Sequence, residues 1–142
     1  MKRLVLAGFL CVGLVGCAHV ATTKATFVRQ SDKPLVLTIA RHMDTIVRGP
    51  DDEEDQRLVL ELRNVEVGKR YAIPSDDVAA HFSVQRFGPA SQGETFHGAM
   101  VVKKVSEKQV IANVNLVVTA RTADRSYAET ARFRGDYTFT RD

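Results

Sequence analysis

The sequence predicts an all-β fold, either an antiparallel β-sandwich or a small, partly open barrel of about six or seven strands, preceded by a cleaved signal peptide. Apolar residues alternate with polar ones at a period of two along most of the chain after Pro34, as in strands with one buried face. Turn-forming clusters such as "GPDDEEDQ", "GPASQG" and "TADRS" separate the alternating runs. No apolar run of helical period is long enough for an α/β fold.

The first half of the predicted domain contains short candidate strands. Residues 35–39 and 58–62 place leucine or isoleucine at alternate positions, with Met43 in phase with the first run, so each segment gathers its apolar side chains on one face. A shorter strand ends at Pro74, because proline cannot donate a hydrogen bond to a strand ladder. Residues 80–87 alternate again. These segments predict one sheet surface that covers a core.

The last third of the chain predicts a three-stranded antiparallel meander over residues 94–140. Its middle segment, "VIANVNLVVTAR", alternates small or branched apolar residues with polar ones. If the last turn aligns Ala120 with Tyr127, small residues of one strand oppose large residues of the next, which suits a packed face. Gly135 falls in the middle of the last strand, where glycine often marks a bulge or bend.

The chain begins with a segment of a different kind. Lys2 and Arg3 precede thirteen uncharged residues, Leu4 to Gly16. A membrane-spanning helix needs ~20 apolar residues, so this run is too short to span a bilayer. Its length and its basic start are typical of a secretory signal peptide.

The end of this segment carries a resemblance. "LVGC", Leu14 to Cys17, is similar to the lipobox of bacterial lipoproteins. The resemblance implies that the Cys17 thiol is joined to diacylglycerol, that the peptide bond before Cys17 is cut, and that the new amino group is acylated. The expected organisation is a signal peptide over 1–16, a lipidated flexible tether over 17–33, and a single β-sandwich domain over 34–142.

Several expectations follow from this resemblance. Cys11 leaves with the signal peptide, so the mature chain has no free thiol for catalysis or metal binding. The 20 basic residues become 18 against 17 acidic residues, and the net charge falls from +3 to +1. The basic residues do not gather on one face, so the sequence does not indicate a nucleic-acid partner. Ala18 is not the aspartate that retains lipoproteins at the inner membrane in enteric-type sorting, so the resemblance implies an outer-membrane lipoprotein that faces the periplasm.

No residue pattern indicates an enzyme, a metal site or a cofactor. A hairpin that aligns Phe82 with Met100 separates His81 from His97 by ~14 Å, too far to share an ion. The acidic run "DDEED" lacks the alternating ligands of a calcium loop. The tripeptide "RGD" at Arg134 falls within a predicted strand, not in the protruding loop that recognition of this tripeptide needs. We expect a non-catalytic protein without cofactors.

One long connection favours binding. It is "QRFGPASQGETFHG", and loops at one end of a β-scaffold commonly carry function. A plain hairpin loop with its flanking aromatic residues in the core is the competing interpretation. The candidate partner-binding residues are Phe87, Gly88, Pro89, Ser91, Gln92 and Phe96.

The leading hypothesis is therefore a membrane-anchored periplasmic lipoprotein that acts as a non-catalytic binding or accessory module of the cell envelope. Its expected partners are the membrane, through the lipid on Cys17, and an envelope protein. One alternative is a carrier of a small apolar ligand, in a barrel cavity lined by residues such as Phe82, Met100 and Phe133. Another is an inhibitor of a periplasmic hydrolase that uses the "GPASQG" loop.

Overall fold

The computed structural model describes residues 18–45, 53–86 and 88–142. These residues form eight β-strands, and the all-β prediction is confirmed. The strands are β1 (Ala18–Val28), β2 (Leu35–Thr45), β3 (Glu54–Leu62), β4 (Arg70–Ile73), β5 (Val78–Arg86), β6 (Ser91–Val105), β7 (Gln109–Thr122) and β8 (Ala128–Arg141).

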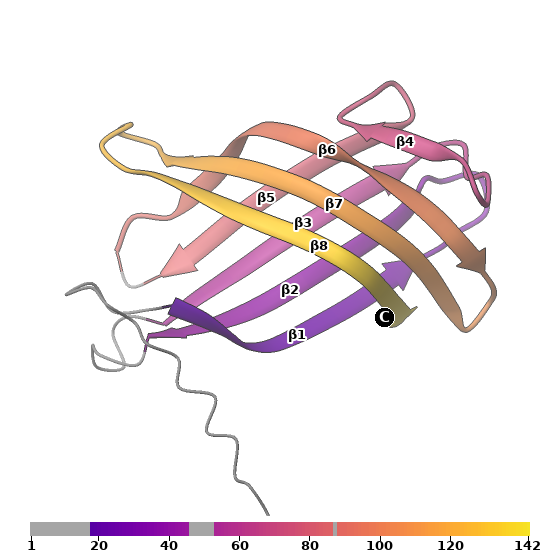
Figure 1. Cartoon of the computed structure of the whole chain (residues 1–142), viewed down its shortest axis with the longest axis horizontal. Coiled ribbons are helices and arrows are strands. Elements are labelled where there is room, and N and C mark those ends of the chain that lie inside the picture. The colour runs from indigo at the N-terminus through magenta and orange to yellow at the C-terminus, as the bar shows by residue number, and fades with distance from the viewer. Residues whose placement is uncertain (1–17, 46–52, 87) are drawn as a thin grey trace, which may run out of the picture.

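Seven of the strands close into a barrel (Figure 1). The order around the ring is β6-β5-β3-β2-β1-β8-β7, and a β6–β7 pairing closes it, while β4 adds to the edge of β6. A closed ring in which all neighbours are antiparallel needs an even number of strands. Seven strands therefore leave one parallel pair, which is β1–β8. The barrel alternative is confirmed: the ring is closed and mixed, and β1 and β8 close it through only two paired positions.

The barrel interior is filled by apolar side chains. Phe82, Met100 and Phe133 are at most 3% exposed, and the rings of Phe82 and Phe133 meet edge to face with centroids 5.8 Å apart. Because the side chains of a strand alternate between its two faces, each buried run follows the period of two that the sequence shows. The largest fully buried side chains include Phe27, Leu37, Ile39, Leu58, Leu60, Leu62, Leu116 and Phe139.

The chain between residues 17 and 33 differs from the predicted tether. Strand β1 occupies Ala18–Val28 and pairs with β2 at ten positions. Its strand pattern is weak in the sequence because Ala25 and Phe27 are the apolar, inward-facing residues of its Thr22–Val28 part. The barrel therefore begins at Ala18, and residues 1–17, including the predicted lipidation site, lie outside the described residues.

The meander is confirmed, but its last register differs by two residues. Ala120 pairs with Glu129 and not with Tyr127. The reason is the turn, in which the Thr122 amide donates to the Tyr127 carbonyl at 3.0 Å, so the hairpin closes around residues 123–126. A shift of two keeps the same residues inward, so the predicted core face is unchanged. Gly135 adopts a φ of 125° without a break in this register.

The β5–β6 hairpin is shorter than predicted. Ser83 pairs with Gln92 and Val84 with Ser91, so Phe82 does not oppose Met100. Farther along β6, Met100 pairs with Tyr71 of β4 instead. The connection that the sequence suggested as a long loop is short, because β6 already begins at Ser91.

Candidate functional site: an open seam and a charged barrel end

The two edges of β8 are paired to very different extents. Its β7 edge is paired at thirteen positions, from Ala128 to Thr140. Its β1 edge is paired at two, where Thr26 and Phe27 meet Thr140 and Arg141, with one further bond from the Asp142 amide to the Phe27 carbonyl at 3.2 Å. Figure 1 shows β1 and β8 meeting near the end of β8 and separating toward its start. We call the unpaired edges, residues 18–25 of β1 and 128–139 of β8, the β1–β8 seam.

A second short pairing in the ring is covered in a way that the seam is not. Strands β5 and β6 also pair at only two positions. Beyond them β4 pairs with residues 98–101 of β6, and a Cβ on Gly93 would lie 2.9 Å from the Cβ of Phe82, so the strands are in close contact there. Among the described residues, no strand covers the unpaired edges of the seam in this way.

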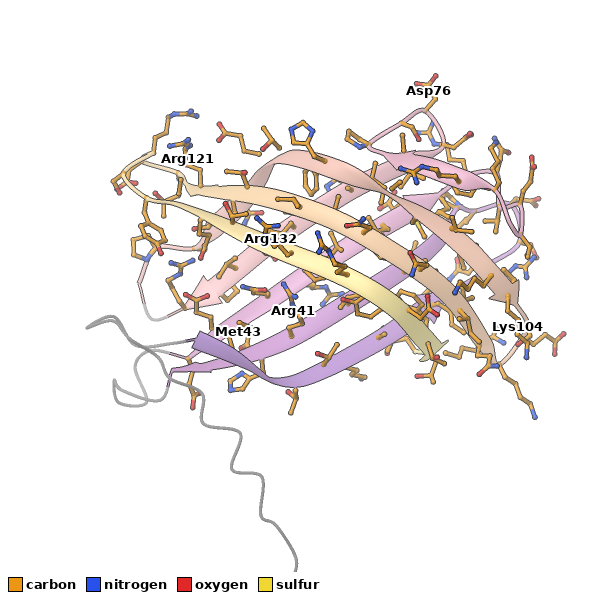
Figure 2. All side chains as sticks on the ribbon, in the orientation of Figure 1. Arg41, Met43, Asp76, Lys104, Arg121 and Arg132 are labelled. Carbon is orange, nitrogen blue, oxygen red and sulfur yellow. The ribbon has the colours of Figure 1, made fainter. Side chains whose placement is uncertain are left out.

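Arg41 of β2 lies in the seam. It is in phase with the inward residues Leu37 and Ile39, and Figure 2 shows its side chain beside β8. One terminal nitrogen donates to the main-chain carbonyl of Arg132 at 2.7 Å. The other donates to Gln56 at 2.6 Å. Arg41 thus satisfies a β8 carbonyl that points toward β1 and has no strand partner.

The guanidinium of Arg41 is a cation in a largely apolar site. Its carbon lies 3.7 Å from the centre of the Phe133 ring, a cation–π contact. Its buried Nε has no hydrogen-bond partner, and it forms no ion pair with a carboxylate among the described residues. Burial lowers the pKa of Arg41 from its ordinary value, an effect that Tyr137 opposes. An arginine remains charged under these conditions, so the seam holds a positive charge that no carboxylate in the described residues neutralises.

A charged cluster occupies the barrel end beside the open part of the seam. Arg86 of β5 forms an ion pair with Glu129 of β8 and lies 3.8 Å from Glu54 of β3. The Arg86 and Glu129 side chains are 17% and 14% exposed, so the pair is mostly buried. Burial raises the pKa of the Glu54 carboxyl above its ordinary value; Arg86 opposes this and Glu129 adds to it. Tyr127 lies over the Arg86 guanidinium at 5.2 Å.

The outer face of the seam is positive. Lys24 of β1 and Arg132 and Arg134 of β8 are exposed and form no ion pair within the described part of the chain. The acid on this part of β8, Asp136, is already engaged by Lys103 at 2.9 Å and Asn113 at 2.8 Å. These bonds lower the pKa of Asp136. Together with Arg41, four cations that pair with no carboxylate in the described ranges flank the seam.

The structure divides the six residues of the predicted binding loop. Phe87 lies outside the described residues. Gly88 and Pro89 are exposed in the short β5–β6 connection, but Ser91 is fully buried. Gln92 is exposed within β6, and Phe96 packs partly against the core. Ser91 and Phe96 therefore fit the competing interpretation, in which the residues that flank a short hairpin loop are packed into the barrel.

Sequence reasoning missed Arg41, Arg86, Gln56 and Glu129. A signal was present, since each lies in phase with the inward apolar residues of its strand, and Gln56, Arg86 and Glu129 also lie close to a strand end. A charged residue at an inward position is unusual, and several of them from different strands indicate one polar barrel end. The contact between Arg41 and the Arg132 carbonyl left no such signal, because it depends on how the ring closes.

Two further depressions occur among the described residues, and Lys24 and Arg41 line the smaller one. One of about 310 Å³ crosses the outer face of β1, β2, β3 and β5, where His42 Nδ1 contacts Asp55 at 2.7 Å. Another, of about 1090 Å³, lies at the barrel end where β1 and β8 are paired, and is lined largely by exposed polar residues. No group of three potential metal ligands occurs in 18–45, 53–86 and 88–142. Within the same ranges no helix is long and apolar enough to cross a membrane.

Comparisons with protein-family models, with curated proteins and with solved structures give no match.

Proposed function

We propose that this protein is a membrane-anchored periplasmic lipoprotein whose barrel is a non-catalytic module that binds an envelope protein. Cys17 carries the lipid, and the barrel faces the periplasm from the outer membrane. The observation that carries the binding role is the β1–β8 seam. Unpaired strand edges are ready templates for pairing with another chain, and strand addition is a common mode of peptide recognition.

The start of β1 supports a seam close to the membrane. Because β1 begins at Ala18, the residue after the proposed lipid attachment site already belongs to the barrel. No spacer separates the lipid from the fold. The open part of the seam also begins at Ala18, so a partner bound there lies near the membrane surface.

The filled interior favours this function over the two alternatives. An apolar-ligand carrier needs a cavity, whereas Phe82, Met100 and Phe133 are buried against neighbouring side chains. A hydrolase inhibitor would need a protruding loop, whereas only four residues separate β5 from β6. Neither alternative has an observation comparable to the seam in its favour.

The anchor is tested through Cys17. Intact-mass analysis of the full chain, expressed in a bacterium with lipoprotein processing, is expected to show a chain that begins at Cys17 and carries acyl groups. A Cys17→Ser chain is expected to lose the acyl mass and to leave the membrane fraction. An unacylated wild-type chain, or a Cys17→Ser chain that still fractionates with membranes, would contradict the anchor.

The binding role is tested with a photo-crosslinking amino acid. Placed at Thr130, it lies on the exposed face of β8 beside the seam; placed at Asn115, it lies on the exposed face of β7, which is paired on both edges. We expect one envelope protein to crosslink from Thr130 in intact cells and not from Asn115. Equal adducts from both positions, or none from either, would count against the seam as the binding surface.

A further inference from the structure

The β1–β8 seam has a defined strand geometry, charge and side-chain content, which together specify its occupant. We infer that the partner contributes an extended acidic segment that enters the seam as an added strand, antiparallel to both β1 and β8, with one inward carboxylate paired to Arg41. This inference rests on the function proposed above and names the chemistry of its partner.

The direction of the added strand follows from the ring. Strands β1 and β8 run parallel to each other, so a strand placed between them is either parallel or antiparallel to both. An antiparallel strand would raise the ring from seven strands to eight, and every neighbouring pair would then be antiparallel. Antiparallel pairing is slightly more stable per residue than parallel pairing, which favours this direction.

The position of the added strand follows from Arg41 and from the paired end. The edges are joined at Thr26 and Thr140, and neighbouring strands lie ~4.8 Å apart. An added strand needs edges about twice that distance apart, so it fits only away from the joined end. Arg41 already occupies this part, where it donates to the Arg132 carbonyl. A partner amide can take over that carbonyl, and the Arg41 guanidinium then becomes available to an incoming side chain.

The acidic character follows from the unneutralised charges. An added strand alternates its side chains between the barrel interior and the solvent. An inward acidic side chain meets Arg41, whose buried Nε has no partner. Outward acidic side chains meet Lys24, Arg132 and Arg134, which are exposed and without ion pairs among the described residues. Hydrogen bonds between an arginine and a carboxylate are charge-assisted and roughly twice as strong as neutral ones, and the fork of an arginine can hold both carboxylate oxygens.

Strand β4 also has an edge to which a partner's strand could add. This edge is less suited than the seam to the acidic segment. Strand β4 has four residues and is followed at once by Pro74. Short edge strands and prolines are the usual means by which proteins discourage strand addition. We therefore expect a peptide to choose the seam over β4.

The test uses the full, lipidated chain in detergent micelles and fluorescein-labelled peptides of about ten residues, the length of a long strand. One peptide carries glutamates on both faces, and its matched control carries lysine at each glutamate position. Fluorescence anisotropy is expected to show binding of the acidic peptide that weakens with salt, and no binding of the basic one. Binding of the two peptides with equal affinity would overturn the acidic assignment.

Variants locate the inward contact. Arg41→Gln is expected to weaken acidic-peptide binding at least about tenfold, because the partner carboxylate would lose its charged hydrogen-bond partner. The control Arg57→Gln removes an exposed arginine from β3, and we expect less than about a twofold change there. If both variants weaken binding equally, the attraction is general and the Arg41 contact is wrong.

Amide signals report the mode of binding. The even-numbered amides of β8 from Thr130 to Thr138 lie on the same edge as the Arg132 carbonyl, and we expect the peptide to protect them from hydrogen exchange. A spin label on the peptide N-terminus should broaden signals near Tyr137 and not near Ala128, as antiparallel pairing requires. The inference would be overturned if the peptide protected the amides of β4 from exchange. It would also be overturned if the spin label broadened signals near Ala128 and not near Tyr137. If no peptide binds while the Thr130 crosslink in cells persists, this inference fails and the proposed function stands; loss of both overturns both.

Discussion

The two edges of β8 present the same strand in two environments. Toward β7 the strand is paired at thirteen positions, and toward β1 it is paired at two. The exposed residues along it are ordinary strand residues such as Thr130, Arg132 and Thr138, so intrinsic strand propensity does not account for the difference. The direction of the two neighbours differs, because a ring of seven strands must contain a parallel pair, which here is β1–β8.

The protein replaces the absent ladder with side chains. Arg41 reaches from β2 to the Arg132 carbonyl, and Arg86 of β5 holds Glu129 of β8. Inward-pointing charges and exposed arginines are also known devices that protect strand edges from indiscriminate pairing. The same charged residues can therefore repel a second basic strand edge and attract an acidic strand. Specificity requires both, the repulsion of wrong partners and the attraction of the right one.

Proline substitutions should give the largest contrast between the two edges. Asn115→Pro places proline in β7, which is paired with β6 and β8 on its two sides, and removes a ladder hydrogen bond. We expect a loss of at least about 3 kcal/mol in the free energy of unfolding. Arg132→Pro removes an amide that faces the open edge, so it should cost about 1–2 kcal/mol less. Urea denaturation measures both; equal costs would mean that the seam edge is paired.

Removal of Glu129 should have the next largest effect. Glu129→Gln leaves Arg86 without its closest carboxylate at a site where both side chains are mostly buried. Breaking a buried ion pair on one side costs several kcal/mol, and we expect about 2–3 kcal/mol at this partly exposed site. The control is Glu107→Gln in an exposed turn, expected to stay within about 0.5 kcal/mol. If the two variants are equally stable, the cluster does not hold the open end.

Replacement of Arg41 should change association more than stability. Arg41→Met removes a buried charge and keeps much of the side-chain volume, but it also removes the hydrogen bonds to Arg132 and Gln56, so we expect a loss of about 1–2 kcal/mol in the free energy of unfolding. The Arg132 carbonyl is then left open, and we expect more self-association at high protein concentration, measured by sedimentation velocity. Arg57→Met, on the outer face of β3, is the matched control. If the Arg41→Met variant stays monomeric and its free energy of unfolding falls by several kcal/mol, the role of Arg41 is to stabilise the fold.

Much of the fold was predictable, because burial on one side of a strand imposes a period of two. Leu58, Leu60 and Leu62 show that period, and all three are buried on one face. Most of strand β1 was placed in the predicted tether, with only a short strand near Phe27 left as a possibility, because β1 offers too few apolar inward residues. The ring closure was also beyond sequence reasoning, since it depends on how strands distant in sequence meet, and no local pattern distinguishes a sandwich from a barrel.

The site was less predictable than the fold. The phase of Arg41, Arg86 and Glu129 along their strands was visible in the sequence, and a stricter reading of inward charges would have placed them at one barrel end. The seam was not visible, because it depends on how β1 and β8, at opposite ends of the chain, meet in the ring. The loop hypothesis placed Ser91 at the surface because loop length was judged from Gly88, Pro89 and Gly93, whereas Ser91 already pairs with Val84 and Thr122.

The β7–β8 turn offers the smallest and most local test of how the paired edge of β8 begins. Asp124 accepts hydrogen bonds from the Ser126 hydroxyl at 2.7 Å, the Ser126 amide at 3.0 Å and the Thr122 hydroxyl at 2.7 Å. These bonds, those from Ser126 first, lower the pKa of Asp124 from 3.8 to about 2. Because the folded pKa lies below the unfolded one, the stabilisation is complete above pH 3.8 and is lost as the pH falls toward about 2.

Carboxyl-carbon NMR titration of Asp124 checks this directly. Ser126→Ala removes the hydroxyl donor and is expected to raise the pKa of Asp124 toward its ordinary value, while the β7–β8 register persists in the amide protection of Ala131 and Phe133. Asp124→Asn should remove this carboxyl's share of the acid sensitivity altogether. If Asp124 in the wild-type protein titrates at its ordinary pKa, its hydrogen bonds with Ser126 and Thr122 do not hold the turn. The turn would then be closed by the backbone bond from the Thr122 amide to the Tyr127 carbonyl and by the strand pairing beyond it.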